Sequence, residues 1–309
     1  MKYFFNRFRT LWKLKQFFRE NAAQGKPLCV MDDLVFKTML SMDTEDSRQA
    51  LRSLVSACTQ RKVSSVRLVN NELIPAHLMS KPVRLDVNVT FNDGEIANLE
   101  MQIKRTDDDL KNRAAYYSAM LLAAQAERGK PYKEIKRVYQ IFFLNCILFP
   151  QSNKLPRRYR LMEVEEHDVL TEVTEIIFYE LPKLKQRVND YLAGKSSIEN
   201  LSDEEMWCIF MKYRDKERVK PLIMELYRKE EGIMQAEKSL ARIARNYSKY
   251  IREMSIKKNN YERAVMVEAA RKELQAQWHA EGRKKERELF LELLKSGKSQ
   301  EEILKLYDK

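Results

Sequence analysis

The sequence predicts an α/β fold in which a mixed β-sheet is flanked by helices and followed by a helical, charge-rich extension. Two stretches between residues 83 and 103 alternate strictly between apolar and polar side chains, which is the pattern of β-strands with one buried face. Residues 137–149 form the most apolar run of the chain, as in a central strand buried on both faces. Only 7 of the 309 residues are glycine and 33% are charged, a composition that favours helices elsewhere.

The first 27 residues predict a basic, amphipathic helix and a short linker. On a helix over residues 1–21, one side would carry Phe4, Phe8, Leu11, Leu14 and Phe18. Lysines and arginines interrupt the apolar residues, so the segment lacks the continuous apolar run of a secretory signal. We expect this helix to dock on the body of the protein, with contact to a membrane surface or to nucleic acid as the alternative.

Residues 28–182 predict the α/β core. In chain order we expect helices over 31–42 and 45–60, a strand over 65–73, a β-hairpin over 83–105, a helix over 107–128, and strands over 137–149 and 174–181. The aspartates at positions 107–109 suit the N-terminus of the helix that they open, and Gly129 and Pro131 suit its end.

Residues 183–309 predict a third region, which is helical and rich in charges. Its last part suggests a helical hairpin that turns at residues 296–298, where Ser299 and Glu302 make a capping box for the final helix. Charged helices of this kind most often present a solvated face or an oligomerisation surface, so a homodimer through them is consistent with the pattern. A DNA-binding element is the alternative interpretation.

The composition restricts the partners and the compartment. The formal net charge is +12, from 57 Lys and Arg against 45 Asp and Glu, which favours a polyanionic partner such as nucleic acid or an acidic membrane surface. The four cysteines are scattered without a CxxC pair, which predicts reduced thiols in a cytoplasmic protein. No apolar stretch reaches the roughly 18–20 residues of a membrane span. The sequence also lacks the GxxxxGK[ST], HExxH and GxSxG motifs, so nucleotide hydrolysis, zincin and serine-hydrolase chemistry have no support.

The turn of the hairpin sets the register of its strands. Asn92-Asp93-Gly94 suits a three-residue loop, a type I turn closed by a glycine in the left-handed region. With that loop Phe91 pairs with Glu95. A two-residue loop at Asp93-Gly94 is the alternative and would shift every pair.

This register predicts two opposed carboxylates on the polar face of the hairpin. With the three-residue loop Asp86 lies opposite Glu100, and directly opposed Cβ atoms are about 4.5–5.5 Å apart. Both carboxylates could then reach one divalent cation, which would relieve their repulsion. Gln102 and Lys104 follow on the same face. With a two-residue loop Asp86 would face Met101, and Glu100 would be diagonal but still within reach.

An Asp on one strand and a Glu-x-Gln on the next, followed by a helix, is typical of a nuclease, because phosphodiester hydrolysis needs a hard cation held by oxygen ligands. Residues 33–180 resemble the PD-(D/E)XK nuclease superfamily, in particular its transposase-like branch, the recombination-promoting nucleases of bacteria. The matching stretches are DLVFK (Asp33–Lys37), RLDV (Arg84–Val87), LEMQ (Leu99–Gln102), RAAYYSAML (Arg113–Leu121) and PYKEIKRVYQIFF (Pro131–Phe143), and the tail over residues 280–303 is similar as well. The resemblance implies a restriction-endonuclease-like core.

The resemblance also implies roles for the hairpin residues. Asp86 and Glu100 would be metal ligands. Gln102 would occupy the position where the wider superfamily has lysine and this branch commonly has glutamine, whose amide can orient a water but carries no charge. Lys104, two residues further on the same face, is a candidate to restore that charge.

Other site residues are expected on the helices. The acidic residue of the early helix would be Asp33, a third candidate metal ligand, with Glu45 or Asp46 as alternatives; Asp33 could instead be a helix N-cap. Arg113 and Tyr117 are four residues apart on one helix face and are candidate DNA contacts, although a buried tyrosine with a hydrogen-bonded arginine would give the same pattern. Lys37 is a further candidate phosphate contact.

Together these features predict a DNA endonuclease that depends on Mg²⁺, or on Mn²⁺, and acts in DNA recombination or mobile-element biology. DNA is the expected partner, and no small-molecule cofactor is expected. A catalytically inactive member whose fold binds DNA or protein is the first alternative, because Gln102 replaces the lysine. A helical interaction protein whose function lies in residues 183–309 is the second.

Overall fold

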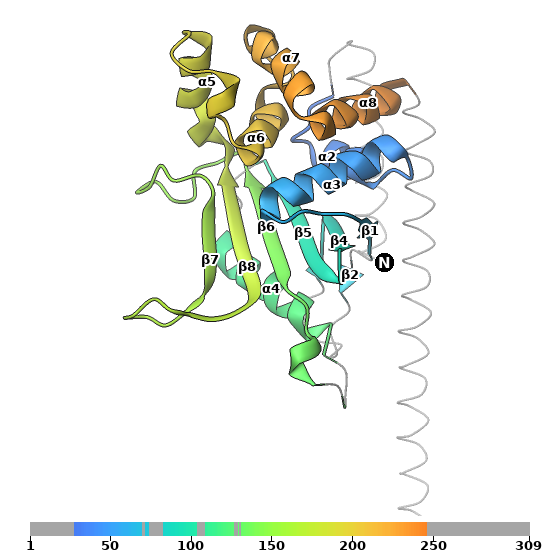
Figure 1. The fold of residues 1–309 in the computed structure, drawn as a ribbon, viewed down its shortest axis with the longest axis vertical. Helices are drawn as coiled ribbons and strands as arrows, with labels where there is room; N and C mark the ends of the chain where they lie inside the picture. Colours follow the sequence, from blue (N-terminus) through green and yellow to red (C-terminus); the bar gives the residue numbers. More distant parts are fainter. Residues whose placement is uncertain are drawn as a thin grey trace, which may run out of the picture. The chain divides into compact units, whose positions relative to one another are not determined.

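The structure, a computed structural model, describes residues 28–69, 72–73, 83–103, 109–126, 129 and 131–245. The central element is a six-stranded mixed sheet with the order β1-β4-β5-β6-β8-β7 (Figure 1). Its strands are β1 (Val66–Leu68), β4 (Val87–Phe91), β5 (Glu95–Gln102), β6 (Val138–Leu144), β7 (Arg157–Met162) and β8 (Val169–Glu180). A separate two-stranded sheet consists of β2 (Glu72–Leu73) and β3 (Val83–Arg84). The α/β class and the mixed sheet are therefore as predicted.

Seven α-helices lie in the described part of the chain: α2 (Asp33–Ser41), α3 (Glu45–Thr59), α4 (Leu110–Ala123), α5 (Lys185–Leu192), α6 (Asp203–Tyr213), α7 (Lys220–Lys229) and α8 (Glu231–Arg245). Short 3-10 helices are η1 (Tyr132–Glu134), η2 (Leu181–Leu184), η3 (Ile198–Asn200) and η4 (Glu217–Val219). None of these described helices is both long and apolar enough to cross a membrane. The helix expected over residues 1–21 and the tail after residue 245 lie outside the described residues.

The direction of the strands brings several chain ends to one edge of the sheet. Strands β5, β6 and β8 run parallel, whereas β4 pairs antiparallel with β5 and β7 pairs antiparallel with β8. The carboxyl ends of the three parallel strands therefore meet at the edge where β4 begins. That edge carries the candidate active site.

Helices cover both faces of the sheet around the fully buried strand β6, as predicted for the most apolar run (Figure 1). Helix α4 packs through Leu110 and Ala114 against the face that carries Phe142. On the opposite face Phe36 of α2 packs against Phe143, with 5.9 Å between the ring centroids. Adjacent residues of a strand point to opposite faces, so the two contacts place α2 and α4 on different sides.

The polar face of the hairpin is buried, and the expectation of one buried and one solvated face is wrong. Asn88, Asn98 and Glu100 are all buried although they alternate with apolar residues. Helix α4 covers this face, where its Leu121 packs with Val138 of β6. Asn98 and Glu100 are hydrogen-bonded to each other within this buried face, with 2.9 Å between Asn98 Nδ2 and Glu100 Oε1.

Several predicted boundaries differ from the structure. The strand expected over 65–73 is divided into β1 and β2, and the first hairpin strand is interrupted at residues 85–86. The helix after the hairpin begins one residue after its N-cap Asp109, as the aspartate cluster suggested, but ends at Ala123. Strand β7 was not predicted, because an exposed edge strand reading RRYRLM has no apolar run and no strict alternation.

The helices after β8 pack onto the core rather than apart from it. Trp207 and Phe210 of α6 are fully buried. The hydroxyl of Ser239 in α8 donates to the carbonyl of Met39 at 2.8 Å and lies 3.1 Å from the hydroxyl of Ser47 in α3. The compact unit of described residues extends to Arg245.

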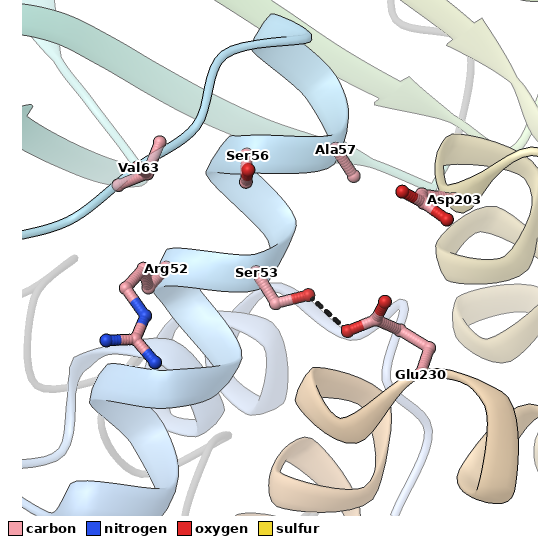
Figure 2. A pocket seen from close by; sticks show the side chains of 7 residues that line it. All are labelled: Arg52, Ser53, Ser56, Ala57, Val63, Asp203 and Glu230. Atoms are coloured by element: carbon pink, nitrogen blue, oxygen red, sulfur yellow. Dashed lines mark hydrogen bonds between the residues drawn. The ribbon is translucent and has the colours of Figure 1, made fainter.

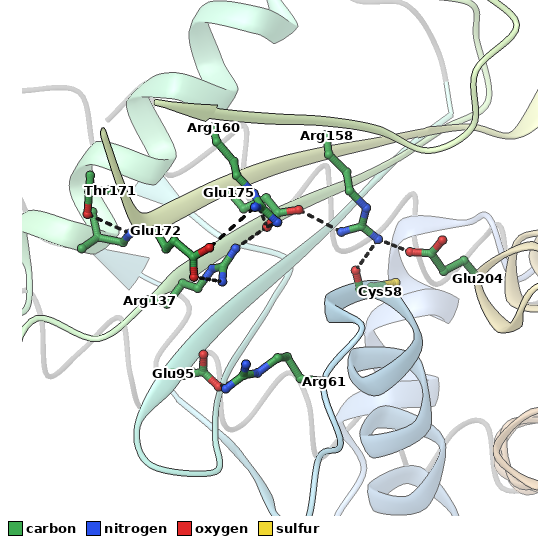
Figure 3. A network of polar contacts seen from close by, with 11 residues as sticks. Cys58, Arg61, Glu95, Arg137, Arg158, Arg160, Thr171, Glu172, Glu175 and Glu204 are labelled. Atoms are coloured by element: carbon green, nitrogen blue, oxygen red, sulfur yellow. Dashed lines mark hydrogen bonds and ion pairs between the residues drawn. The ribbon is translucent and has the colours of Figure 1, made fainter. Parts of the chain in front are cut away.

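A network of ion pairs ties α6 and α3 to the outer strands (Figure 3). Arg158 of β7 donates to Glu175 Oε1 at 3.0 Å, to the carbonyl of Cys58 at 3.0 Å, and to Glu204 of α6. Glu204 also accepts a hydrogen bond from the hydroxyl of Tyr179 at 2.8 Å. One guanidinium group thus joins β7, β8, α3 and α6.

Candidate active site

The hairpin has the register of the three-residue loop. Phe91 pairs with Glu95 and Val87 pairs with Leu99, and the backbone N–H of Gly94 donates to the carbonyl of Phe91 at 3.1 Å. Gly94 has a φ of +98°, a conformation that glycine adopts without strain. The two-residue alternative is therefore wrong.

Backbone hydrogen bonds connect the segments that carry Asp86 and Glu100. Asp86 lies in the bend between β3 and β4, where its backbone N–H donates to Glu100 Oε1 at 3.0 Å. In return the backbone N–H of Met101, directly after Glu100, donates to Asp86 Oδ2 at 3.0 Å. Each carboxylate is thus fixed by the backbone of the segment that carries the other. The pair predicted from the register is formed, and the bend positions it.

Burial makes this pair of carboxylates electrostatically unfavourable. Glu100 is 4% exposed, and its Oε1 accepts a second hydrogen bond from Asn98 Nδ2 at 2.9 Å. The same amide donates to Gln140 Oε1 at 3.0 Å. Burial, with the nearby charge of Asp86, raises the pKa of Glu100 to about 8. At neutral pH the pair therefore favours either a bound proton or a bound cation.

A lysine from helix α2 neutralises the Asp86 side of the pair. Lys37 Nζ lies 2.8 Å from Asp86 Oδ1 and 2.8 Å from Asp33 Oδ1. Burial raises the pKa of Asp86 even though the lysine beside it favours the charged form. Burial disfavours the Lys37 ammonium, but the carboxylates of Asp86 and Asp33 outweigh that effect and leave the pKa of Lys37 raised.

Asp33 is not the N-cap of its helix. Asp32 caps α2 by accepting hydrogen bonds from the backbone N–H groups of the second and third helical residues, at 3.0 and 3.3 Å. The ion pair that the structure shows for Asp33 is with Lys37, so Asp33 is linked to Asp86 through the lysine. The alternatives Glu45 and Asp46 pair elsewhere, at the start of α3.

Gln102 is held by helix α4. Arg113 Nη2 donates to Gln102 Oε1 at 3.2 Å, and the guanidinium group lies over the rings of Tyr117 and Phe142, at 5.7 and 5.8 Å from their centroids. The structure therefore brings Arg113 and Tyr117 together beside Gln102. Lys104 lies outside the described residues.

Two residues at this edge were not predicted from the sequence. The backbone N–H of Asn145, directly after β6, donates to the carbonyl of Gln102 at 2.9 Å, and Lys212 Nζ of α6 donates to Asn145 Oδ1 at 2.7 Å. Lys212 lies in the region over residues 183–309 that was predicted to be helical and rich in charges. A lysine at the end of the otherwise apolar run MWCIFM was the only signal in the sequence.

The donor set at the pair fits a hard divalent cation. Asp86 and Glu100 offer carboxylate oxygens. Among the described residues no three or more His, Cys, Asp or Glu side chains gather as a metal cluster. An ion at this site would therefore have two carboxylates together with carbonyl or water ligands, which is the environment that Mg²⁺ accepts and that zinc sites lack.

A separate polar pocket of about 220 Å³ lies beside α3 (Figure 2). Its lining residues are Arg52, Ser53, Ser56, Ala57, Val63, Asp203 and Glu230. Across it the hydroxyl of Ser53 donates to Glu230 Oε1 at 2.8 Å. None of the residues predicted for the active site lines this pocket.

The comparisons with known proteins agree with the geometry. Residues 30–270 of the 309 match a family model described as PD-(D/E)XK nuclease family transposase. No curated protein and no solved structure matches the chain. The match covers more than half of the sequence and includes the hairpin, helix α4 and the described helices after the sheet. The chain therefore belongs to the PD-(D/E)XK nuclease family transposases.

Proposed function

We propose that the protein is a DNA endonuclease that depends on Mg²⁺ or Mn²⁺ and acts in DNA recombination or in mobile-element biology. The observation that carries this proposal is the carboxylate pair of Asp86 and Glu100, in which each side chain accepts a backbone hydrogen bond from the other segment. Such a pair has a fixed geometry and an excess of negative charge. The family match supports nuclease chemistry with DNA as the substrate.

Each residue at this edge of the sheet would have its own role in phosphodiester hydrolysis. Asp86 and Glu100 would hold the ion, which when bound lowers the pKa of a water and polarises the phosphate. Gln102, whose carbonyl oxygen is held by Arg113, would orient the attacking water through its amide NH₂ group. Arg113 would add positive charge where the phosphate approaches.

Removal of the metal or of one carboxylate tests the proposal. Supercoiled plasmid should be nicked with Mg²⁺ or Mn²⁺ and left intact with EDTA. Asp86→Asn should lower the nicking rate at least about 10²-fold, because it removes charge from the pair and keeps the shape of the side chain. Agarose gel densitometry of initial rates measures both. Equal rates with and without EDTA, or for wild type and variant, would contradict the proposal.

Lys212 is expected to bind the DNA backbone near Gln102. Lys212→Ala should weaken DNA binding modestly and reduce the slope of log Kd against log salt concentration by about 1, because one phosphate contact is lost. Fluorescence anisotropy of a labelled duplex at several salt concentrations measures the slope. Lys229→Ala is the matched control, since this lysine of α7 pairs with Glu199 of η3 at 2.5 Å. An equal slope for both variants would remove Lys212 from the interface.

A catalytically inactive nuclease fold that binds DNA or protein is the second candidate. The neutral Gln102 in place of a lysine favours it. In that case the protein would bind duplex DNA but would leave plasmid DNA intact at every metal concentration. The same nicking assay, run with anisotropy on the same preparation, separates the two functions.

A further inference from the structure

Position 102 gives the scissile phosphate no charge of its own, and Arg113 beside it is hydrogen-bonded to Gln102. Hydrolysis of a phosphodiester adds the oxygen of water to phosphorus and breaks one ester P–O bond, and negative charge grows on the non-bridging oxygens as this happens. A fixed cation near those oxygens stabilises this charge and lowers the barrier to hydrolysis. Gln102 is uncharged, and its Oε1 already accepts a hydrogen bond from Arg113.

Among the described residues, the ion pair shown at Asp86 is the one with Lys37. Its ammonium contacts Asp86 Oδ1 at 2.8 Å. It reaches the site from α2, in a part of the sequence about 50 residues before Asp86, and the sequence predicted it only as a candidate phosphate contact. Its side chain is 21% exposed, which suits a group inside a site better than one that follows a DNA backbone across the surface.

Two features fix the position of the Lys37 ammonium before any substrate binds: its ion pair with Asp33 and the packing of helix α2. Asp33, one turn earlier on α2, holds the same ammonium at 2.8 Å. The helix itself is fixed by Phe36, which is fully buried against Phe143, and by its N-cap Asp32. If a bound ion took Asp86 Oδ1 from Lys37, Asp33 would still hold the ammonium at the edge. A charge held in this way needs little reorganisation during the reaction.

We propose that Lys37 is the catalytic cation of this site and replaces a lysine at position 102. It donates a hydrogen bond to a non-bridging oxygen of the scissile phosphate and stays protonated throughout. One proton of the attacking water goes to solvent, and the departing oxygen takes a proton in turn. This inference rests on the proposed nuclease function and adds to it the residue that stabilises the transition state.

The test compares Lys37→Met, Lys37→Arg and Asp33→Asn with wild type. Lys37→Met should lower the single-turnover cleavage rate by about 10²–10³-fold, because it removes one charge-stabilising group. Its Kd for duplex DNA should stay within about threefold, and its affinity for Mn²⁺ by calorimetry should be equal or tighter, since a competing cation has left Asp86. Lys37→Arg should restore part of the rate. Asp33→Asn, which removes only one anchor, should cost less than Lys37→Met.

Wild type and Glu100→Gln are measured in the same assay to separate the two proposals. If wild type cleaves, Glu100→Gln does not, and Lys37→Met cleaves within about threefold of wild type, the inference about Lys37 is wrong and the nuclease proposal stands. A loss confined to the DNA Kd, or a loss of Mn²⁺ binding, would also overturn the inference. If wild type fails to cleave, or Glu100→Gln cleaves equally well, the nuclease proposal falls and the role of Lys37 falls with it.

Discussion

Glu100→Gln is expected to abolish metal-dependent cleavage and, at pH 8, to stabilise the metal-free protein. The glutamine Oε1 can accept the two hydrogen bonds that Glu100 now accepts, from the Asp86 backbone and from Asn98. It carries no charge, so it removes both a proposed metal ligand and the repulsion from Asp86. A functional side chain whose charged form is disfavoured by burial commonly lowers the free energy of unfolding in this way.

The pH dependence of the free energy of unfolding tests whether the burial of Glu100 causes this effect. The pKa of Glu100 is about 8 in the folded protein, against an ordinary value of 4.5. Between these values the unfolded chain has released a proton that the folded chain still binds. The contribution of Glu100 is therefore complete below about pH 4.5 and is lost as the pH rises toward 8.

Urea unfolding followed by circular dichroism in EDTA, at pH 5, 7 and 8, measures this effect. The free energy of unfolding of wild type should fall relative to that of Glu100→Gln as the pH rises. Glu95→Gln is the control, because this glutamate lies at the other end of β5 and faces Arg61 at 3.8 Å. If the free energies of unfolding of wild type and Glu100→Gln differ by a constant amount from pH 5 to 8, burial of Glu100 does not lower stability as the pH rises.

Arg158→Ala is expected to be the most destabilising single substitution in the described network. The change would leave Glu175 and Glu204 without their shared guanidinium group and the carbonyl of Cys58 without its donor (Figure 3). Removal of one partner from a buried ion pair costs about 3–5 kcal/mol, since the remaining charge stays buried. The loss should appear as a lower urea midpoint.

Arg160→Ala provides the comparison for Arg158. Both arginines lie on β7 and contact Glu175, but Arg160 is 35% exposed and its other partner, Glu172, is exposed. Arg137 still donates to Glu175 Oε2 when Arg160 is absent. Arg160→Ala should therefore cost about 1 kcal/mol or less. Equal losses for the two variants would show that the link from β7 to α3 and α6 contributes little.

The local features of the site could be predicted from the sequence. The turn at residues 92–94 fixes the register by its own chemistry, and alternation identifies which side chains share a face. From these two facts Asp86 and Glu100 were placed opposite each other, and the ladder from Val87 to Phe91 confirms the register.

Features that depend on tertiary packing could not be predicted in the same way. The alternation continues through residues 85 and 86, so nothing in it indicates the bend that points the Asp86 backbone at Glu100. The burial of Asn98 depends on helix α4, whose position above the sheet is not written in the strand pattern. Lys37 and Lys212 reach the edge from helices far away in the sequence, and only the arrangement of those helices brings them there.

The most direct test of the account is a calorimetric titration of metal-free protein with Mn²⁺ at pH 7.5, for wild type and for Asp86→Asn. We expect saturable binding to wild type and at least a tenfold loss of affinity in the variant. Binding should release protons, because the raised pKa of Glu100 leaves the pair partly protonated. Binding of equal affinity to both proteins would place the ion elsewhere and would contradict the assignment of this pair as the metal site.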